Sequence, residues 1–156
     1  MPNWCSNRVV FNGSKDKLRK LKKFFQHMSK LATKESKGQL PDFFKASPGY
    51  LFDIRWEDGV LYYETRWSPN IDVMQAIAEH FVVDFTYEYD EMNMQIYGEY
   101  TFIKGVLANI ELEQSDFQQF ELLEKKDAWI FEGKEYEALE LILEILLERK
   151  KQIQKK

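Results

Sequence analysis

Residues 51–67 contain the sequence feature that most constrains the fold, a short turn between two aromatic-rich runs. Asp58-Gly59 separates the runs 51–57 and 60–67, and an Asp-Gly pair favours a two-residue turn because both positions of such a turn need positive φ. The two runs are therefore predicted to form a β-hairpin. In the second run, alternate residues share one face that is predicted to be buried, namely Leu61, Tyr63, Thr65 and Trp67.

A helix is predicted to follow the hairpin directly. Ser68 can cap its N-terminus, and Pro69 suits its first position, where no backbone N–H is needed. An apolar stripe then recurs at helical spacing, formed by Ile71, Met74, Ile77, Ala78 and Phe81. The strand and the helix together are expected to lie at the middle of the fold.

The other elements in the first two thirds of the chain complete an α+β pattern. A strand is predicted at 7–11 and a helix at 15–33, with Ser14 as the N-cap of the helix. Further strands are predicted at 82–89 and 93–104, where apolar and polar residues alternate. The order is β-α-β-β-α-β followed by one extra strand. This order predicts the ferredoxin-like plan, an antiparallel sheet backed by two helices.

The last third of the chain is predicted to be a helical extension. We divide the chain into a ferredoxin-like α+β domain at 1–104 and an extension at 105–156 that packs on it. The sequence Ser-Asp-Phe-Gln that begins at Ser115 is typical of a capping box and predicts a helix over 115–126. Another helix is predicted from about Lys134 to the end. Its apolar stripe is wide, which favours core packing over a coiled coil.

Length and composition indicate one cytoplasmic domain. The chain has 156 residues, and its hydrophobic content of 44% is sufficient for a real core. No apolar run approaches the roughly 20 residues of a membrane span, and the N-terminal sequence lacks the apolar core of a signal peptide. We therefore expect no membrane contact, a cytoplasmic location, and a monomer or a homodimer.

The charge distribution is strongly asymmetric. Residues 1–50 carry 11 Lys and Arg against 3 Asp and Glu, whereas residues 51–148 carry 6 against 23. A basic front and an acidic body can pair within the fold or with a partner, and solvated helix faces are the simpler explanation. The predicted helix at 15–33 concentrates the basic charge. Its outer face is the candidate electrostatic contact surface, made of Lys15, Arg19, Lys20, Lys22 and Lys23.

The sequence contains no recognisable catalytic, cofactor or metal motif. His27 and His80 have no second His or Cys at ligand spacing, and no glycine-rich phosphate loop is present. Cys5 is the single cysteine, so an internal disulfide is excluded. As a nucleophile it would need a base or a helix N-terminus to lower its pKa. A buried structural cysteine is therefore the favoured interpretation.

Two stretches resemble a known family. The N-terminal Asn-Trp-Cys-x-Asn of residues 3–7, followed by a strand and Gly13, and the Trp-Ser-Pro corner at 67–69 are similar to the YubB-type ferredoxin-like domain family; the Tyr97-Gly98 pair supports this. The resemblance covers roughly residues 1–104. It implies the ferredoxin-like fold and a setting on plasmids, phages and conjugative elements, but no reaction. Longer members carry a segment between the first helix and the hairpin that is here reduced to a loop.

Two classes of function remain. The favoured one is a non-enzymatic interaction module that acts through protein contacts. Nucleic-acid binding through the basic first helix is less favoured, because the helix lacks aromatic residues between its cations and the predicted outward sheet face is acidic. The other class is a small-ligand binder or enzyme. A deep pocket would favour it over the interaction module if lined by Asn3, Trp4, Cys5, Asn7, Trp67 and Asn70.

Overall fold

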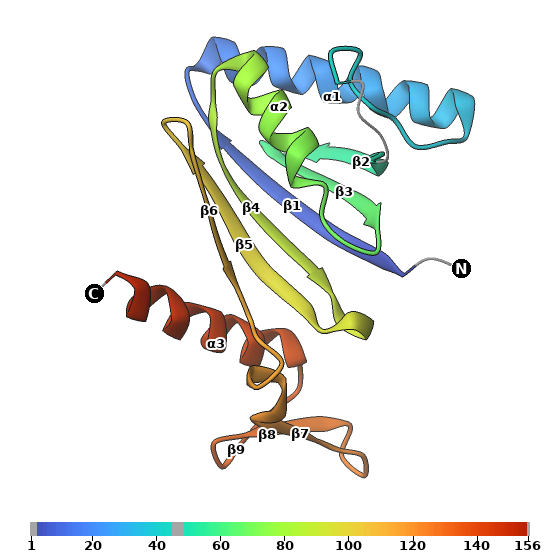
Figure 1. Ribbon diagram of the computed structural model, residues 1–156. Helices are drawn as coiled ribbons and strands as arrows, with labels where there is room; N and C mark the ends of the chain where they lie inside the picture. The colour runs from blue at the N-terminus through green and yellow to red at the C-terminus, as the bar shows by residue number, and fades with distance from the viewer. Residues whose placement is uncertain (1–2, 45–48, 156) are drawn as a thin grey trace.

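The computed structural model describes residues 3–44 and 49–155. The first half of the chain has the element order β-α-β-β-α-β. The second half consists of further strands and a final helix (Figure 1). The strands are β1 (Trp4–Asn12), β2 (Phe52–Glu57), β3 (Val60–Arg66), β4 (Asp84–Glu91), β5 (Ile96–Ile103), β6 (Val106–Glu111), β7 (Phe120–Leu123), β8 (Ala128–Phe131) and β9 (Lys134–Tyr136). The helices are α1 (Lys15–Glu35), α2 (Ile71–Phe81) and α3 (Leu139–Gln154), with 3₁₀ turns η1 (Met92–Met94) and η2 (Asp116–Gln118).

The main sheet has six strands in the order β2-β3-β1-β4-β5-β6, and every neighbouring pair is antiparallel. Its first four strands, with α1 and α2, have the β-α-β-β-α-β arrangement expected from the sequence. The predicted α+β, ferredoxin-like fold is confirmed. The predicted hairpin at Asp58-Gly59 is also confirmed. Ser14 caps α1 as predicted, because its hydroxyl accepts a hydrogen bond from the Lys17 amide. Within the main sheet, β5 and β6 follow β4, where one strand was predicted.

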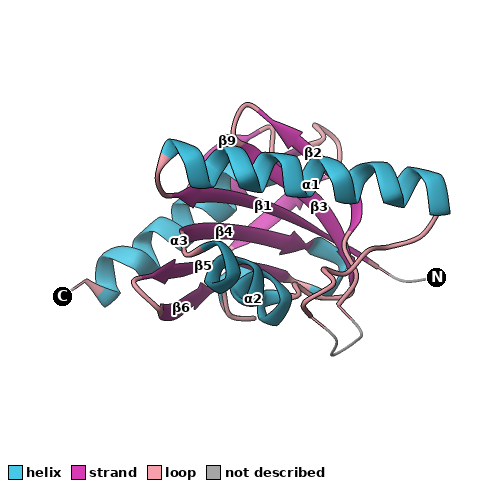
Figure 2. Ribbon diagram, turned by 90° about the horizontal axis from the view of Figure 1, so that it is seen from above, coloured by secondary structure: helices cyan, strands magenta, loops and turns pink. Residues whose placement is uncertain are grey.

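The helices lie on both sides of the main sheet. α1 and α2 cover one face, called here the inner face, and α3 lies against the opposite, outer face (Figures 1 and 2). Alternate residues of each strand point to the inner face and are buried there, as Cys5, Asn7, Val9 and Phe11 along β1 show. None of the described helices is both long and apolar enough to cross a membrane.

A second core joins the C-terminal part to the edge of the main sheet. α3 contributes Ile142, Leu143, Leu146 and Leu147, which pack with Phe131 and other residues of the three-stranded sheet β7-β8-β9. The predicted helix at 115–126 is wrong, because this segment forms η2 and then β7. The Asp116 carboxylate does accept a backbone N–H, but that of Glu113, which precedes it. The helix predicted from Lys134 begins only at Leu139.

Three consecutive cations fix α3 in place. Arg149 pairs with Glu132 at 2.6 Å, Lys150 pairs with Asp116 at 2.9 Å, and Lys151 contacts Glu99 of β5. The positive charge at this end of α3 is therefore used inside the fold. The division of the chain at residue 104 stays a prediction, and β6 carries the main sheet past that point.

The strand-to-helix corner differs from the prediction in two ways. α2 begins at Ile71 with Asn70 at the N-cap, so Ser68 and Pro69 lie in the corner before the helix. Trp67 is 50% exposed, and its predicted burial is wrong. Its φ of 70° is left-handed, so the backbone turns out of the strand after Arg66 and the alternation that buries Thr65 does not extend to Trp67.

Candidate functional site

A hydrogen-bonded network of polar side chains is buried on the inner face. The Tyr63 hydroxyl donates to Asn70 Oδ1 at 2.6 Å, and the Tyr87 hydroxyl donates to Asn7 Oδ1 at 2.7 Å. The Asn7 amide nitrogen contacts Thr65 Oγ1 at 3.0 Å, and that of Asn70 donates to the Gly49 carbonyl at 2.8 Å. Burial strongly raises the pKa of both tyrosines, so they stay neutral. The network joins β1, β3, β4 and the corner before α2.

Cys5 belongs to the same buried region. Its side chain is fully buried, and its Sγ lies 3.7 Å from Asn7 Oδ1. Burial raises the pKa of the thiol to about 12, with smaller contributions from the carboxylates of Asp90 and Glu91. Because the thiolate is the reactive form of cysteine, this environment suits a structural side chain.

The six candidate residues of the Asn-Trp-Cys site separate into two groups. Cys5, Asn7 and Asn70 are buried and connected through Tyr87. The other group is more exposed: Trp4 is 41% exposed and Trp67 is 50% exposed. The Asn3 carbonyl accepts a hydrogen bond from the Trp67 amide at 2.8 Å. Among the described residues, the network occupies the space between the buried members.

The outer face places different side chains together, in rows across the strands. One row runs through Glu64 of β3, Ser6 of β1 and Asp90 of β4, which are direct partners in the strand register. The next row runs through Tyr62, Arg8 and Glu88 in the same way. Neighbouring side chains in such rows lie within reach of one another. The two rows form the floor of a groove.

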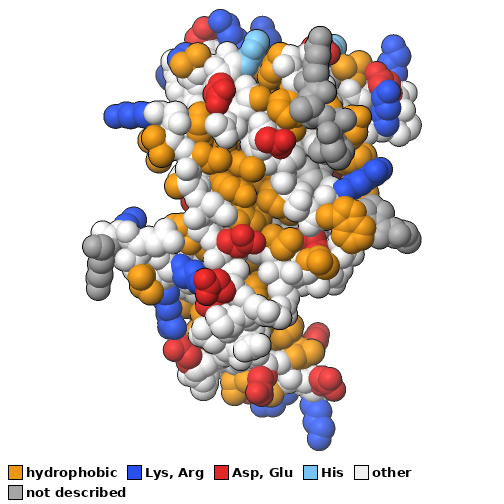
Figure 3. Space-filling model, in the orientation of Figure 1, with side chains coloured by type: hydrophobic (Ala, Val, Ile, Leu, Met, Phe, Trp, Pro, Cys, Tyr) orange, Lys and Arg blue, Asp and Glu red, His pale blue; other side chains and the backbone are white. Residues whose placement is uncertain are grey.

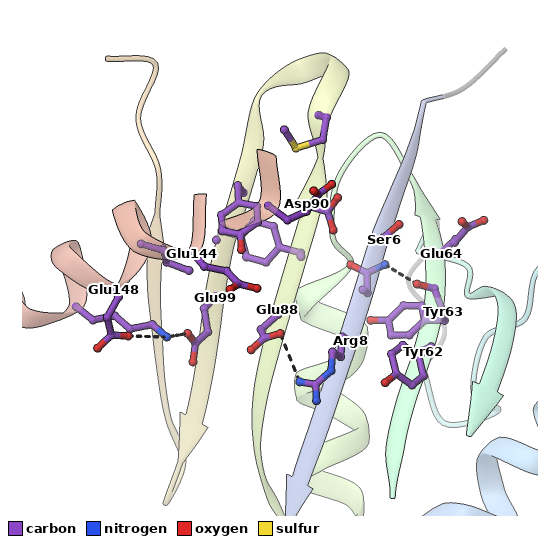
Figure 4. Close-up of a pocket in the computed structure, with 18 of the residues that line it drawn as sticks. Ser6, Arg8, Tyr62, Tyr63, Glu64, Glu88, Asp90, Glu99, Glu144 and Glu148 are labelled. Atoms are coloured by element: carbon purple, nitrogen blue, oxygen red, sulfur yellow. Dashed lines mark hydrogen bonds and ion pairs between the residues drawn. The ribbon is translucent and has the colours of Figure 1, made fainter. Parts of the chain in front are cut away.

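The wall of the groove is α3. Glu144 and Glu148 extend from this helix toward the floor, where Glu99 of β5 meets Lys151 (Figure 4). The groove has a volume of about 530 Å³ and is open to solvent. It exists because α3 packs over the β5-β6 side of the sheet, where Ile110 contributes to the second core, and leaves β1 and β3 uncovered.

Carboxylates outnumber cations in the groove. Its lining includes three cations, Arg8, Arg55 and Lys151, and seven acidic residues, Glu64, Glu88, Asp90, Glu99, Glu140, Glu144 and Glu148. Arg8 pairs with Glu88 at 3.4 Å, and Lys151 pairs with Glu99 and Glu148. Within residues 3–44 and 49–155, no ion-pair partner lies within 4 Å of the remaining four, Glu64, Asp90, Glu140 and Glu144.

The excess of negative charge affects the titration of groove residues. Partial burial raises the pKa of Asp90, and the nearby carboxylates of Glu140 and Glu91 raise it further. The pKa of Tyr97, which pairs with Asp90 across β4 and β5, is also raised, first by burial and then by Glu144 and other carboxylates. Burial is the larger cause of both shifts, and the neighbouring carboxylates act in the same direction.

An aromatic and arginine patch adjoins the groove at the start of β1. The Trp4 and Phe52 rings contact edge to face, with centroids 5.1 Å apart. The Arg66 guanidinium lies 4.8 Å from the Phe52 centroid and 6.0 Å from that of Trp4. These three residues form the patch. Trp4 and Arg66 are register partners, one step along the strands from the Ser6–Glu64 row.

The basic surface of α1 lies on the other side of the molecule. Lys15, Arg19, Lys20, Lys22 and Lys23 are all exposed. Lys and Arg side chains line the upper edge of the molecule, over α1 (Figure 3). Lys20 pairs with Asp16 of the same helix at 3.5 Å. The other four cations have no ion-pair partner among the described residues. α3 is on the opposite side of the sheet, so its acidic residues do not compensate the α1 cations.

Sequence reasoning identified part of the groove and missed the rest. The alternation that assigned Leu61, Tyr63 and Thr65 to the buried face leaves Tyr62, Glu64 and Arg66 on the opposite side of the strand, and these residues do lie on the outer face. The contribution of α3 was missed, because its position depends on the second core. The signal available was the spacing of Glu140, Glu144 and Glu148, four residues apart, which places the three on one side of a helix.

A family profile described as the ferredoxin-like domain in Api92-like protein matches residues 51–132. The match covers just over half of the chain, from the start of the β2-β3 hairpin to the end of β8. No curated protein and no solved structure gives a significant match.

Proposed function

We propose that this chain, which belongs to the family of ferredoxin-like domains in Api92-like proteins, is a non-enzymatic interaction module that binds a protein partner on its outer sheet face. The observation that carries this proposal is the groove between α3 and the uncovered part of the main sheet. Among residues 3–44 and 49–155, the inner face is covered by α1 and α2, and the Asn7–Tyr87–Asn70 network lies buried beneath them.

The patch beside the groove supports protein binding. Trp and Arg are the residue types most enriched at the centres of protein interfaces, and here Trp4, Phe52 and Arg66 lie together beside the groove. Trp4 is 41% exposed in the free chain. A partner that covers the patch would bury this ring, which is the usual source of binding energy at such sites.

The cellular setting follows from the resemblance of residues 3–7 and 67–69 to the YubB-type family. We propose that the protein is encoded on a mobile element and acts in the cytoplasm. The partner would then be a protein of the same element or of its host. The groove does not distinguish these two sources.

Nucleic-acid binding through α1 is the second candidate. The observation in its favour is the exposure of five α1 cations, of which Lys20 has an ion-pair partner on its own helix. Clustered cations bind phosphates in a salt-dependent manner. The acidic groove on the opposite side would repel the same polyanion, so the two surfaces suit different partners.

Affinity capture from the native host tests the proposal. Three forms are compared: the wild type, Ser6→Trp, which fills the groove floor, and the double variant Lys20→Glu with Lys23→Glu on α1. Extracts are tested with and without nuclease treatment, and thermal unfolding establishes that each form folds. We expect one protein to be captured by the wild type and the α1 variant and lost with Ser6→Trp. Loss with the α1 variant alone, or loss after nuclease treatment, would replace the proposal by the nucleic-acid function.

A further inference from the structure

We infer that the groove on the outer sheet face binds a short, extended, arginine- or lysine-rich segment of the partner protein. The inference rests on the proposed function and names the chemistry of the occupant. It follows from the charge of the sheet face, from the placement of that charge on the floor and the wall, and from the tyrosines between them.

The unpaired charge of the groove is negative. Arg8 is held by Glu88, Lys151 by Glu99 and Glu148, and Arg55 lies between Asp53 and Glu57. Each groove cation therefore already has a carboxylate, whereas Glu64, Asp90, Glu140 and Glu144 do not, among the residues that the structure describes. A cationic occupant would neutralise these four groups, and an anionic one would be repelled.

The four carboxylates are placed on two sides of the groove. Glu64 and Asp90 flank Ser6 in one row of the floor. Glu140 and Glu144 are one turn apart on the α3 wall. A chain lying between the floor and the wall could direct alternate side chains to each side, as an extended strand does. This arrangement favours an extended segment over a compact ion.

Two tyrosines make the site more suitable for guanidinium groups. Tyr62 on the floor already lies under the Arg55 guanidinium, 5.4 Å from the ring centroid, and Tyr97 lies beside Asp90. Aromatic faces attract guanidinium, and a neighbouring carboxylate adds a charge-assisted hydrogen bond. A phosphate backbone would find neither interaction here, which is why a basic protein segment is favoured over nucleic acid.

The size of the groove limits the occupant to a few residues. Its volume of about 530 Å³ lies within the usual range for sites that hold a small molecule, roughly 300–1,000 Å³. The remainder of the partner would extend onto the Trp4–Phe52–Arg66 patch. We therefore expect a short linear motif to supply the cations.

Titration with a fluorescent octa-arginine peptide, followed by anisotropy at low salt, tests the inference. The groove variant is Glu140→Gln with Glu144→Gln, and the matched control is Glu121→Gln with Glu124→Gln near β7, which changes the net charge equally. All four side chains are exposed, so folding is not at risk. We expect about a 5- to 10-fold rise in Kd for the groove variant and less than about 2-fold for the control. Equal losses, or no binding by the wild type, would overturn the inference.

Two further measurements separate the possible occupants. Backbone amide shifts on adding the peptide are expected to change along β1, β3 and α3, and changes confined to other elements would contradict the inference. Sedimentation of the protein alone tests for a second copy. Self-association that is lost in both the groove variant and the Lys20→Glu, Lys23→Glu variant would show that α1 of another copy is the occupant and would overturn the partner assignment.

The capture experiment distinguishes failure of the inference from failure of the proposed function. If Ser6→Trp abolishes capture of the partner but Glu140→Gln with Glu144→Gln does not, the outer face is the binding surface and its occupant is not basic. If neither variant affects capture, the outer face is not the binding surface and the proposed function fails as well.

Discussion

The two faces of the main sheet are built from the same strands but use their polar residues differently. On the inner face of β1, Asn7 is 3% exposed, and its amide contacts partners on β3 and β4. One residue away on the outer face, Ser6 is exposed and stands between two carboxylates that lack ion-pair partners among the described residues. The Asn7 side chain is hydrogen-bonded within the fold, whereas the two carboxylates beside Ser6 have no ion-pair partner among the described residues.

This difference separates structural from functional candidates. A buried polar group that has all its partners stabilises one arrangement of the core, as the Asn7–Tyr87–Asn70 network does. An exposed group without a partner contributes little to folding and is free to bind something else. The Asn-Trp-Cys segment contains both kinds of residue, since Cys5 and Asn7 point inward and Trp4 is exposed on the outer side.

The largest contrast between the faces is expected in cysteine reactivity. Cys5 is fully buried and has a pKa of about 12, so a thiol reagent at pH 8 should modify it only after the structure opens. We expect its rate to be at least about 1,000-fold below that of the unfolded chain, because core positions open rarely. In the double variant Cys5→Ala with Ser6→Cys, the thiol lies on the outer face and should react rapidly. Fast modification of native Cys5 would contradict its placement.

A smaller but clear contrast is expected in stability. Asn7→Ala removes the amide that contacts the Tyr63 carbonyl, Thr65 Oγ1 and the Tyr87 hydroxyl. Thr65 Oγ1 keeps its hydrogen bond to the Ser68 carbonyl, and the Tyr87 hydroxyl keeps its contacts with Tyr63 and Asn70. The loss is therefore that of three hydrogen bonds, about 2–4 kcal/mol in total. Ser6→Ala should change the free energy of unfolding by less than about 0.5 kcal/mol. Urea unfolding measures both, and equal changes would show that the two faces do not differ in this way.

The smallest expected effect is the dependence of stability on pH at Asp90. Its pKa in the folded protein is raised above the ordinary value of 3.8 by burial and by Glu140 and Glu91. The unfolded chain therefore releases this proton first, and stability falls as the pH rises from below 3.8 through the folded pKa. Asp90→Asn should be more stable than the wild type at pH 7 and equally stable near pH 3. If the difference in stability between the variant and the wild type were the same at both pH values, the folded protein would not raise the pKa of Asp90.

The fold could be predicted from local signals in the first two thirds of the chain. Asp58-Gly59 adopts φ values of 50° and 81°, as its turn requires. Lys104-Gly105 and Glu132-Gly133 adopt nearly the same pair of angles and connect β5 to β6 and β8 to β9. They were missed because Lys and Glu are weaker turn residues than Asp. The strands around Glu132-Gly133 are also short, with four and three residues.

The candidate site was less predictable, because it depends on contacts distant in sequence. No local signal places the bulky Trp67 in a left-handed conformation, and only the tertiary structure shows that Asn70 receives the Tyr63 hydroxyl. The groove requires α3 to lie against the outer face, and this position depends on the second core and on the Lys151–Glu99 pair with β5. The alternation of the strands predicted an acidic outward sheet face, and the outer face does carry Glu64, Glu88 and Glu99. It did not predict that α3 adds further carboxylates opposite them.

Site-specific photocrosslinking in the native host tests most directly whether the outer face is the binding surface. A benzophenone amino acid is placed either at Ser6, on the groove floor, or at Lys23, on the exposed face of α1. Both positions are accessible, so each can report a contact with a partner. We predict that a protein is crosslinked from position 6 and that none is crosslinked from position 23. Crosslinking of a partner from position 23 with none from position 6 would contradict the account.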